Sequence, residues 1–156
     1  MEKTIEIINE LQIEGLIRKY AIGGGIATIF YIEPILTYDL DIFFIPWQEK
    51  RITTLSSIYD WLRKKGYKPY KEHIVIEEIP VQFIPVYNEL VKEAVENSAD
   101  EKYGKTKTRI LKAEYLIAIM LQTFRSKERE KIIKILDETK IDIDYLLRFG
   151  KLDFSL

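Results

Sequence analysis

The sequence predicts an α/β or α+β fold, in which a sheet is flanked by helices and followed by a helical C-terminal part. Two observations support this prediction. In the run over 20–44, YAIGGGIATIFYIEPILTYDLDIFF, an apolar strand leads into three glycines, a short helical segment and a second apolar strand. Towards the C-terminus, apolar residues instead recur at helical spacing. We expect a single domain over 1–156, with an α/β core over 1–97 and a mainly helical extension over 98–156.

The elements of the first half follow from periodicity and punctuation. Helical spacing predicts a first helix over 4–16, which Gly15 ends. A strand over 17–22, a helix over 25–30 and a strand over 38–45 come next and make a β–α–β start. Thr53 or Thr54 would cap a helix running to Lys65, with Gly66 just past its end. Two strands, over 73–77 and 81–86, complete this half.

The second half is predicted to be mostly helical. Asn88 begins a helix to about residue 97, and the polar stretch over 98–107 is expected to be a loop. A short strand over 108–111 leads into an apolar helix over 113–124. Ser126 would cap a helix to about residue 138, and Asp142 would start a last short helix.

Composition excludes several classes of protein. The chain has 156 residues, enough to bury a real core, and a formal net charge of −1, so overall charge gives no reason to expect non-specific nucleic-acid binding. There is no cysteine, which removes disulfides, thiolate catalysis and cysteine zinc sites. The one histidine, His73, is interpreted as an ordinary strand residue.

Location follows from similar arguments. No apolar run reaches the length of about 18 residues that a membrane span needs. The N-terminal segment MEKTIEIINE is acidic and amphipathic, unlike a signal peptide. We therefore expect a cytoplasmic protein, and the richness in Ile, Lys, Glu and Tyr suggests a thermophile.

Two aspartates in the second strand of the run over 20–44 suggest a metal site. Asp39 and Asp41 are one residue apart, so in a strand both side chains lie on one face. Adjacent carboxylates on an apolar strand repel each other unless water or a cation reaches them. Mg²⁺ or Mn²⁺ binds such oxygens and leaves coordination positions for phosphates. The alternative is a solvated strand end without a ligand.

Three glycines before the helix suggest a phosphate site. Gly23, Gly24 and Gly25 let the backbone approach a ligand closely, and amide N–H groups at a helix start attract anions. A plain tight turn is the alternative. Taken together, the glycines and the acid pair are typical of phosphoryl or nucleotidyl transfer.

With these residues in this order, the chain resembles the polymerase-β-type nucleotidyltransferase superfamily, whose signature is a Gly-Gly or Gly-Ser pair, a helix and Asp-x-Asp. The stretches VQFIPVYNELVKEAVENS and AEYLIAIMLQTFRSKEREKIIKIL are similar to nucleotidyltransferase-like families near the abortive-infection toxin group. These likenesses span roughly 17–136. They imply a nucleotidyltransferase-like mixed sheet flanked by helices, NTP and Mg²⁺ (or Mn²⁺) as ligands, and Asp39 and Asp41 as catalytic metal ligands.

The resemblance is incomplete at two positions. Active members carry a third carboxylate that serves as metal ligand and general base, and Gln82 stands at that place. An amide cannot accept a proton at neutral pH, and Glu93 is the other candidate base. Toxin-type relatives have a lysine where Met120 stands, whereas Arg125 and Lys127 are retained as candidate nucleotide-binding cations.

Two functions follow as hypotheses. In the first, the protein binds NTP–Mg²⁺ and transfers NMP to a hydroxyl of RNA (tRNA among them), of a partner protein or of a small molecule. In the second, favoured by Gln82, the same cleft is a catalytically silent module of toxin–antitoxin type that senses a nucleotide or docks a partner. Neither hypothesis involves a membrane, and the oligomeric state is left open.

Overall fold

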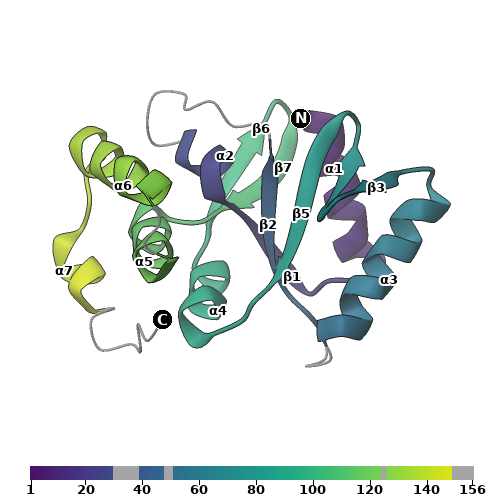
Figure 1. Cartoon of the computed structure of the whole chain (residues 1–156), viewed down its shortest axis with the longest axis horizontal. Coiled ribbons are helices and arrows are strands. Elements are labelled where there is room, and N and C mark those ends of the chain that lie inside the picture. Colours follow the sequence, from purple (N-terminus) through teal and green to yellow (C-terminus); the bar gives the residue numbers. More distant parts are fainter. Residues whose placement is uncertain (30–38, 48–50, 124–125, 149–156) are drawn as a thin grey trace.

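The chain forms a mixed seven-stranded sheet with helices on both faces and a cluster of helices beyond one side (Figure 1). In this computed structural model, the described residues are 1–29, 39–47, 51–123 and 126–148, without the side chains of 28–29, 51–53, 123, 126–128 and 147. The helices are α1 (Glu2–Ile13), α2 (Gly24–Ile29), α3 (Arg51–Lys64), α4 (Glu89–Glu96), α5 (Ala113–Thr123), α6 (Ser126–Glu138) and α7 (Ile143–Leu147). The strands are β1 (Lys19–Gly23), β2 (Leu40–Ile45), β3 (Lys68–Tyr70), β4 (His73–Ile76), β5 (Ile79–Pro85), β6 (Ala99–Tyr103) and β7 (Thr106–Ile110).

The strand order is β3-β4-β5-β2-β1-β7-β6. β2 pairs parallel with β5, and β1 pairs parallel with β7, whereas β1 and β2 are antiparallel. The predicted β–α–β start is therefore not a parallel crossover unit, because the chain reverses direction between β1 and β2. The central strands β1, β2 and β5 carry most of the sheet's buried apolar side chains.

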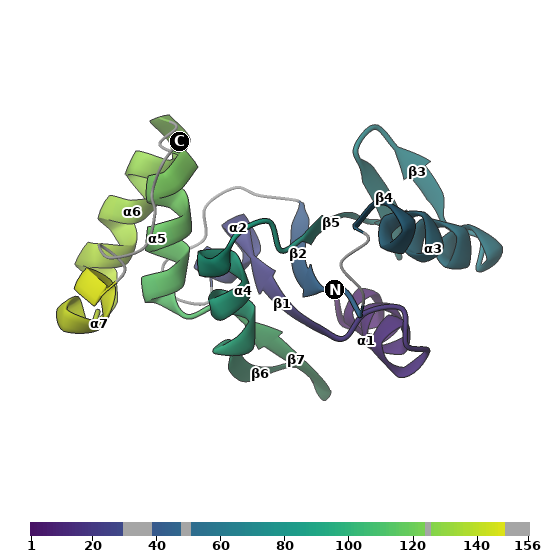
Figure 2. The same ribbon diagram turned by 90° about the horizontal axis from the view of Figure 1, so that it is seen from below.

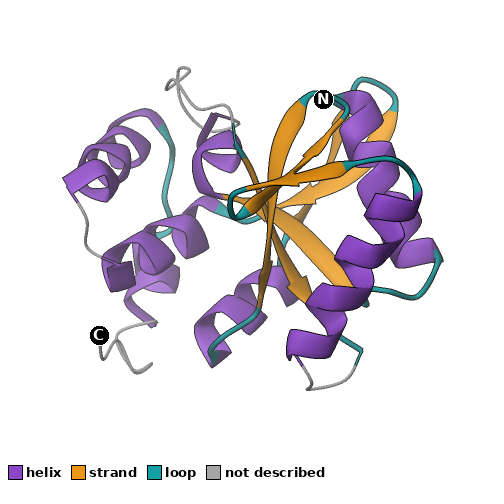
Figure 3. Cartoon of the chain, turned by 45° about the vertical axis from the view of Figure 1, so that its right-hand side comes forward, coloured by secondary structure: helices purple, strands orange, loops and turns teal. Residues whose placement is uncertain are grey.

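Helices cover the sheet on both sides (Figures 2 and 3). Helix α1 turns Ile5, Ile8 and Leu11 inward, and the hydroxyl of Thr4 donates to the carbonyl of Ile76 over 3.0 Å. Figure 2 shows α1 and α3 on one side of the sheet and α5, α6 and α7 on the other, with α2 and α4 between the sheet and α5. No helix within the described ranges is long and apolar enough to cross a bilayer.

Several helix ends agree with the sequence signals, and the start of α3 does not. The side chain of Asn88 accepts a hydrogen bond from the Val91 amide, and that of Asp142 accepts one from the Tyr145 amide, so both are N-caps as expected. Gly15 and Gly66 follow their helices with φ of 75° and 98°, the left-handed backbone typical of a helix C-terminus. Helix α3 starts earlier than predicted, at Arg51 rather than at Thr53 or Thr54.

The stretch over 98–107 is not the loop that its polarity predicted. It forms β6, the turn at Gly104 and the start of β7, and the hairpin extends the sheet at its edge. An edge strand with one solvated face carries few apolar residues, and β6 (ADEKY) is exposed along nearly its whole length. The helical part therefore begins at Ala113 rather than at residue 98. The three-residue strand β3 was also not predicted.

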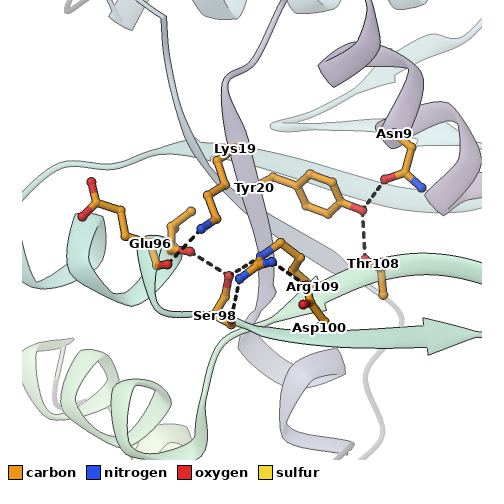
Figure 4. Close-up of polar contacts among 9 residues, drawn as sticks. Asn9, Lys19, Tyr20, Glu96, Ser98, Asp100, Thr108 and Arg109 are labelled. Carbon is orange, nitrogen blue, oxygen red and sulfur yellow. Dashed lines mark hydrogen bonds and ion pairs between the residues drawn. The ribbon is translucent and has the colours of Figure 1, made fainter.

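Polar contacts fasten this hairpin to the sheet (Figure 4). The buried Tyr20 hydroxyl donates to Asn9 Oδ1 over 2.7 Å and lies 2.9 Å from Thr108 Oγ1. Arg109 donates to Ser98 Oγ over 2.8 Å and forms an ion pair with Asp100. These partners come from α1, β1 and both hairpin strands, so the hairpin is an integral part of the sheet.

Candidate functional site

The glycine run lies where β1 passes into α2. Gly23 is the last residue of β1, and Gly24 and Gly25 begin α2. Gly24 has a φ of 59°, and a Cβ on it would lie 2.1 Å from Oδ2 of Asp41. A Cβ on Gly23 would lie 2.3 Å from the Phe43 ring. Side chains of β2 therefore fill the space that side chains at 23 and 24 would need. A Cβ at 23 would displace the Phe43 ring, and one at 24 would displace the Asp41 carboxylate and also strain the left-handed backbone.

The acid pair lies at the start of β2, beside this turn. Asp41 is opposite Gly23 on one neighbouring strand and opposite Gln82 on the other. Residues opposite each other point to the same face of the sheet, so Asp41 and Gln82 are neighbours on one face. Gln82, which the resemblance aligned with a third carboxylate, therefore lies beside Asp41. Asp39 immediately precedes β2, and its side chain is 53% exposed.

A contact that the sequence did not reveal joins Asp39 to His73. Nε2 of His73, the first residue of β4, lies 3.5 Å from Oδ2 of Asp39. The His73 side chain is 15% exposed, so it is mostly covered. Neither His73 nor Asp39 is among the described residues that line the pocket beside Asp41. Nothing in the sequence indicates this contact, because it depends on the pairing of β4 with β5, which is a tertiary feature.

A pocket of about 230 Å³ opens between the sheet and the C-terminal helices. Its walls are mainly apolar, with one carboxylate and one amine among the described lining residues: Gly24, Asp41, Phe43, Ile84, Tyr87, Leu111, Leu116, Ile119, Met120 and Lys131. Burial raises the pKa of Tyr87, whose hydroxyl would be a protonated donor at neutral pH even without this shift. The pocket therefore joins a carboxylate and a glycine turn to an apolar wall.

The structure does not describe the side chains of the two cations predicted to bind nucleotide. Arg125 lies outside the described residues, and Lys127 is in the first turn of α6, where only the backbone is described. Lys131 lines the pocket from the same helix and was missed by sequence analysis. The available signal was its spacing: a residue four positions after Lys127 lies on the same helix face. Met120 does face the pocket, at the place where toxin-type relatives are expected to carry a lysine.

Glu93, the other candidate base, is not among the residues that line the pocket. It lies in α4, and its carboxylate is 3.9 Å from the Arg148 guanidinium. Burial raises the pKa of Tyr115, and hydrogen bonds with Tyr145 and Glu93 add to this rise. Glu93 is therefore part of the contact between α4 and the C-terminal helices.

Comparison with known proteins gives a consistent fold. No family model matches the chain, and no curated protein matches its sequence. Among solved structures, an antigenic nucleotidyltransferase-like protein from Paracoccidioides brasiliensis superposes with a TM-score of 0.57 at 12% identity, over 86% of this chain and 73% of that one. ANT(2″)-Ia in complex with adenylyl-2″-tobramycin gives a TM-score of 0.53 at 15% identity, over 94% and 95%.

This chain has the nucleotidyltransferase fold. The solution structure of the antibiotic-resistance factor ANT(2″)-Ia also superposes on this chain. Its TM-score is 0.51 at 15% identity, over 97% of this chain and 96% of that one. The nucleotidyltransferase fold agrees with the mixed sheet and flanking helices expected from the sequence. The superpositions establish the fold, whereas identities of 12–15% carry no chemistry over, so the chemistry has to be argued from the site.

Proposed function

We propose that this protein binds an NTP with a divalent metal ion and transfers NMP to a hydroxyl group. The observation that carries the proposal is the packing of the Gly24 backbone against the Asp41 carboxylate on the wall of the pocket. A glycine turn and an acid in contact supply both halves of a nucleotide site, on a fold shared with nucleotidyltransferases.

The residues present fit a metal ion. Asp39, Asp41 and the amide oxygen of Gln82 are hard oxygen donors, the kind that Mg²⁺ and Mn²⁺ prefer. No three His, Cys, Asp or Glu side chains of the described part of the chain gather round one point, so phosphate oxygens and water would complete the shell. When bound, the ion would neutralise charge that develops on the phosphates.

The remaining roles fall to this chain's own residues. The backbone of Gly23, Gly24 and Gly25 would hold the triphosphate, and Lys131 would add positive charge from α6, with Arg125 and Lys127 as further candidates. In the reaction, the acceptor oxygen forms a bond to the α-phosphorus and the bond to the β-phosphate oxygen breaks. Pyrophosphate leaves with the electron pair, and the hydroxyl proton passes to water, because the Gln82 amide cannot take it.

The pocket also bears on the acceptor. Among its described lining residues Asp41 is the one acid, Lys131 is a cation and most others are apolar. A polycationic acceptor would find one carboxylate there, which the metal already engages. We therefore favour a neutral or anionic acceptor, and an RNA (tRNA included), a protein hydroxyl or a small molecule all meet this condition.

A second candidate function is a silent module that binds nucleotide or a partner, of the toxin–antitoxin type. The specific observation in its favour is Gln82 in register beside Asp41, where it cannot act as a base. Such a module would bind NTP–Mg²⁺ without releasing pyrophosphate.

One experiment separates these functions. Purified protein is titrated calorimetrically with each NTP in Mg²⁺ or Mn²⁺, then incubated with α-³²P-NTPs, total RNA and lysate protein while pyrophosphate is measured. The enzyme hypothesis expects binding, labelled product and pyrophosphate; the silent module expects binding alone. Asp39→Asn with Asp41→Asn should abolish metal-dependent binding, whereas the control Asp60→Asn on α3 should not. No binding of any NTP at millimolar concentration would refute the enzyme and the nucleotide-binding form of the silent module, and would leave only partner binding.

A further inference from the structure

One row of residues crosses the sheet beside the candidate site. Asp41 on β2 is opposite Gln82 on β5. On β4, Ile74 is opposite Val81, and the next step of this antiparallel register brings His73 opposite Gln82. Opposite residues share a face, so His73, Gln82 and Asp41 follow one another on the pocket side of the sheet. Their backbones span two strand spacings, about 10 Å.

Asp39 brings a carboxylate to His73 in this row. Its Oδ2 lies 3.5 Å from Nε2 of His73. Two donors bound to one ion at about 2.1 Å are separated by roughly 3.0 Å at a right angle and by roughly 3.4 Å at a tetrahedral angle. The observed separation therefore needs only a small adjustment for both atoms to reach a common ion.

We propose that Nε2 of His73 is a metal ligand, which binds the divalent ion together with Asp39 and takes the place that a third carboxylate would otherwise have. The inference rests on the proposed nucleotide–metal site. The geometry provides two protein donors, His73 and Asp39. No third acid or histidine among the described residues lies at the same point, so Asp41 would have to move to join them, and the Gln82 amide oxygen, phosphate oxygens and water would supply the rest.

This ligand set has a consequence for metal choice. Imidazole nitrogen suits borderline transition ions better than it suits Mg²⁺, which prefers oxygen. The site should therefore bind Mn²⁺ or Co²⁺ more tightly than Mg²⁺. His73 would then compensate for Gln82. The residue beside Asp41 on β5 is neutral, and the additional metal ligand comes from β4, the next strand.

The single histidine makes the proposal directly testable. Mn²⁺ is bound to uniformly ¹⁵N-labelled full-length protein, with and without a non-hydrolysable, unlabelled NTP analogue, and pulsed electron paramagnetic resonance detects nitrogen coupled to the ion. Isotopic labelling separates protein ¹⁵N from nucleotide ¹⁴N. An imidazole ¹⁵N coupling in the wild type is the expected result, and because it needs no variant it does not depend on whether a mutant folds.

Variants then test the affinity. His73→Gln should remove the coupling and weaken Mn²⁺ binding roughly 10–100-fold, the range seen when even outer-shell partners of metal ligands are lost. Mg²⁺ affinity should change much less. The control Val75→Thr, on the same strand and face, should leave coupling and affinity as in the wild type.

The outcomes are distinguishable. Mn²⁺ that binds without imidazole coupling, with unchanged affinity in His73→Gln, would overturn the role of His73 and leave the proposed function intact. No Mn²⁺ binding by the wild type, even with the NTP analogue, would overturn the proposed nucleotide–metal site and the His73 ligand with it.

Discussion

Gly24 and Gly15 share a left-handed backbone but differ in their surroundings. Their φ angles are 59° and 75°, yet a Cβ on Gly15 would meet no atom within 4 Å, whereas one on Gly24 would collide with Asp41. This pair separates the cost of backbone strain from the cost of occupied space.

Gly15→Ala is expected to lower the free energy of unfolding by about 1–2 kcal/mol, the cost of a left-handed alanine. Gly24→Ala should lower it further, because Asp41 must also move, and should abolish NTP binding. Urea denaturation and calorimetry measure the two effects. Equal losses of stability in both variants would contradict the close packing of Gly24 on Asp41.

Gln82→Asp tests the missing carboxylate. It places a charge beside Asp41, so without metal the protein should unfold at a lower temperature than the wild type, and Mg²⁺ should restore stability. If an acceptor is present, transfer should rise, since general-base help is worth roughly 10²–10⁴-fold. Gln82→Asn is the matched control, because Asn has the shape of Asp without its charge. A Mg²⁺ effect of the same size in both variants would argue against a metal next to residue 82.

Sequence alone located the glycines, the acid pair and Gln82, because their chemistry is local to one strand–turn–helix unit and to one further strand. It missed Lys131 and the Asp39–His73 contact. Both depend on how distant segments meet: α6 folds over the pocket, and β4 pairs with β5 through a tight turn. Contacts between distant segments do not change the periodicity of apolar residues within each segment, so the sequence pattern does not reveal them.

At the scale of elements, the β3–β4–β5 meander is fastened by a side chain. The hydroxyl of Tyr67, just before β3, donates to Oε1 of Glu77 over 2.8 Å. Glu77 and Glu78 form the turn between β4 and β5, with φ of 49° and 71°. The positive φ at both central residues is typical of a type I′ hairpin turn.

This contact predicts a pH dependence. Burial and the hydrogen bond to Glu77 raise the pKa of Tyr67 to about 12, against about 10 in an unfolded chain. Between these values the unfolded state has lost a proton that the folded state keeps, so the stabilisation is complete below pH 10 and is lost as pH rises to 12. Tyr67→Phe should show a shallower loss of stability over that range than the wild type. Tyr70→Phe is the control and should follow the wild type, because Tyr70 is 62% exposed.

The edge hairpin shows why element prediction failed where it did. Strands β6 and β7 are rich in Lys, Glu, Asp and Thr, and only a few of their side chains are buried. A half-exposed edge has no apolar alternation for a pattern to detect, and its stability comes from pairing and from contacts such as Arg109 with Ser98. The apolar helices and central strands, by contrast, were predicted because burial of one face makes apolar residues recur at regular intervals in the sequence.

At the scale of the whole molecule, the pocket joins two parts of the structure. Its lining comes from the sheet, from the α2 turn and from α5 and α6. A ligand that fills it therefore contacts the sheet and the helical part at once, and should stabilise both against local opening.

Hydrogen exchange should reveal this coupling. In the free protein, amides of β1 and β2 are expected to exchange slowest, because both strands are central and their side chains are almost fully buried. Those of α7, with five residues, should exchange fast. A metal–NTP complex should slow exchange at 23–26 and in α5 and α6 together, while β6 stays unchanged. Protection confined to the sheet would contradict a ligand site that includes Lys131.

The interlock of β1 with β2 also dictates how this protein could change during descent. Asp41 fills the space that a side chain at 24 would need, and Phe43 fills the space at 23, so each glycine and the side chain packed on it form a pair that can change safely only together. If Asp41 is replaced by a smaller residue, the space beside residue 24 becomes free. Gly24 could then be replaced by asparagine, which tolerates a left-handed backbone. Homologues that have lost catalytic activity should therefore show correlated substitutions at positions 24 and 41, and a sequence alignment would reveal them without an assay.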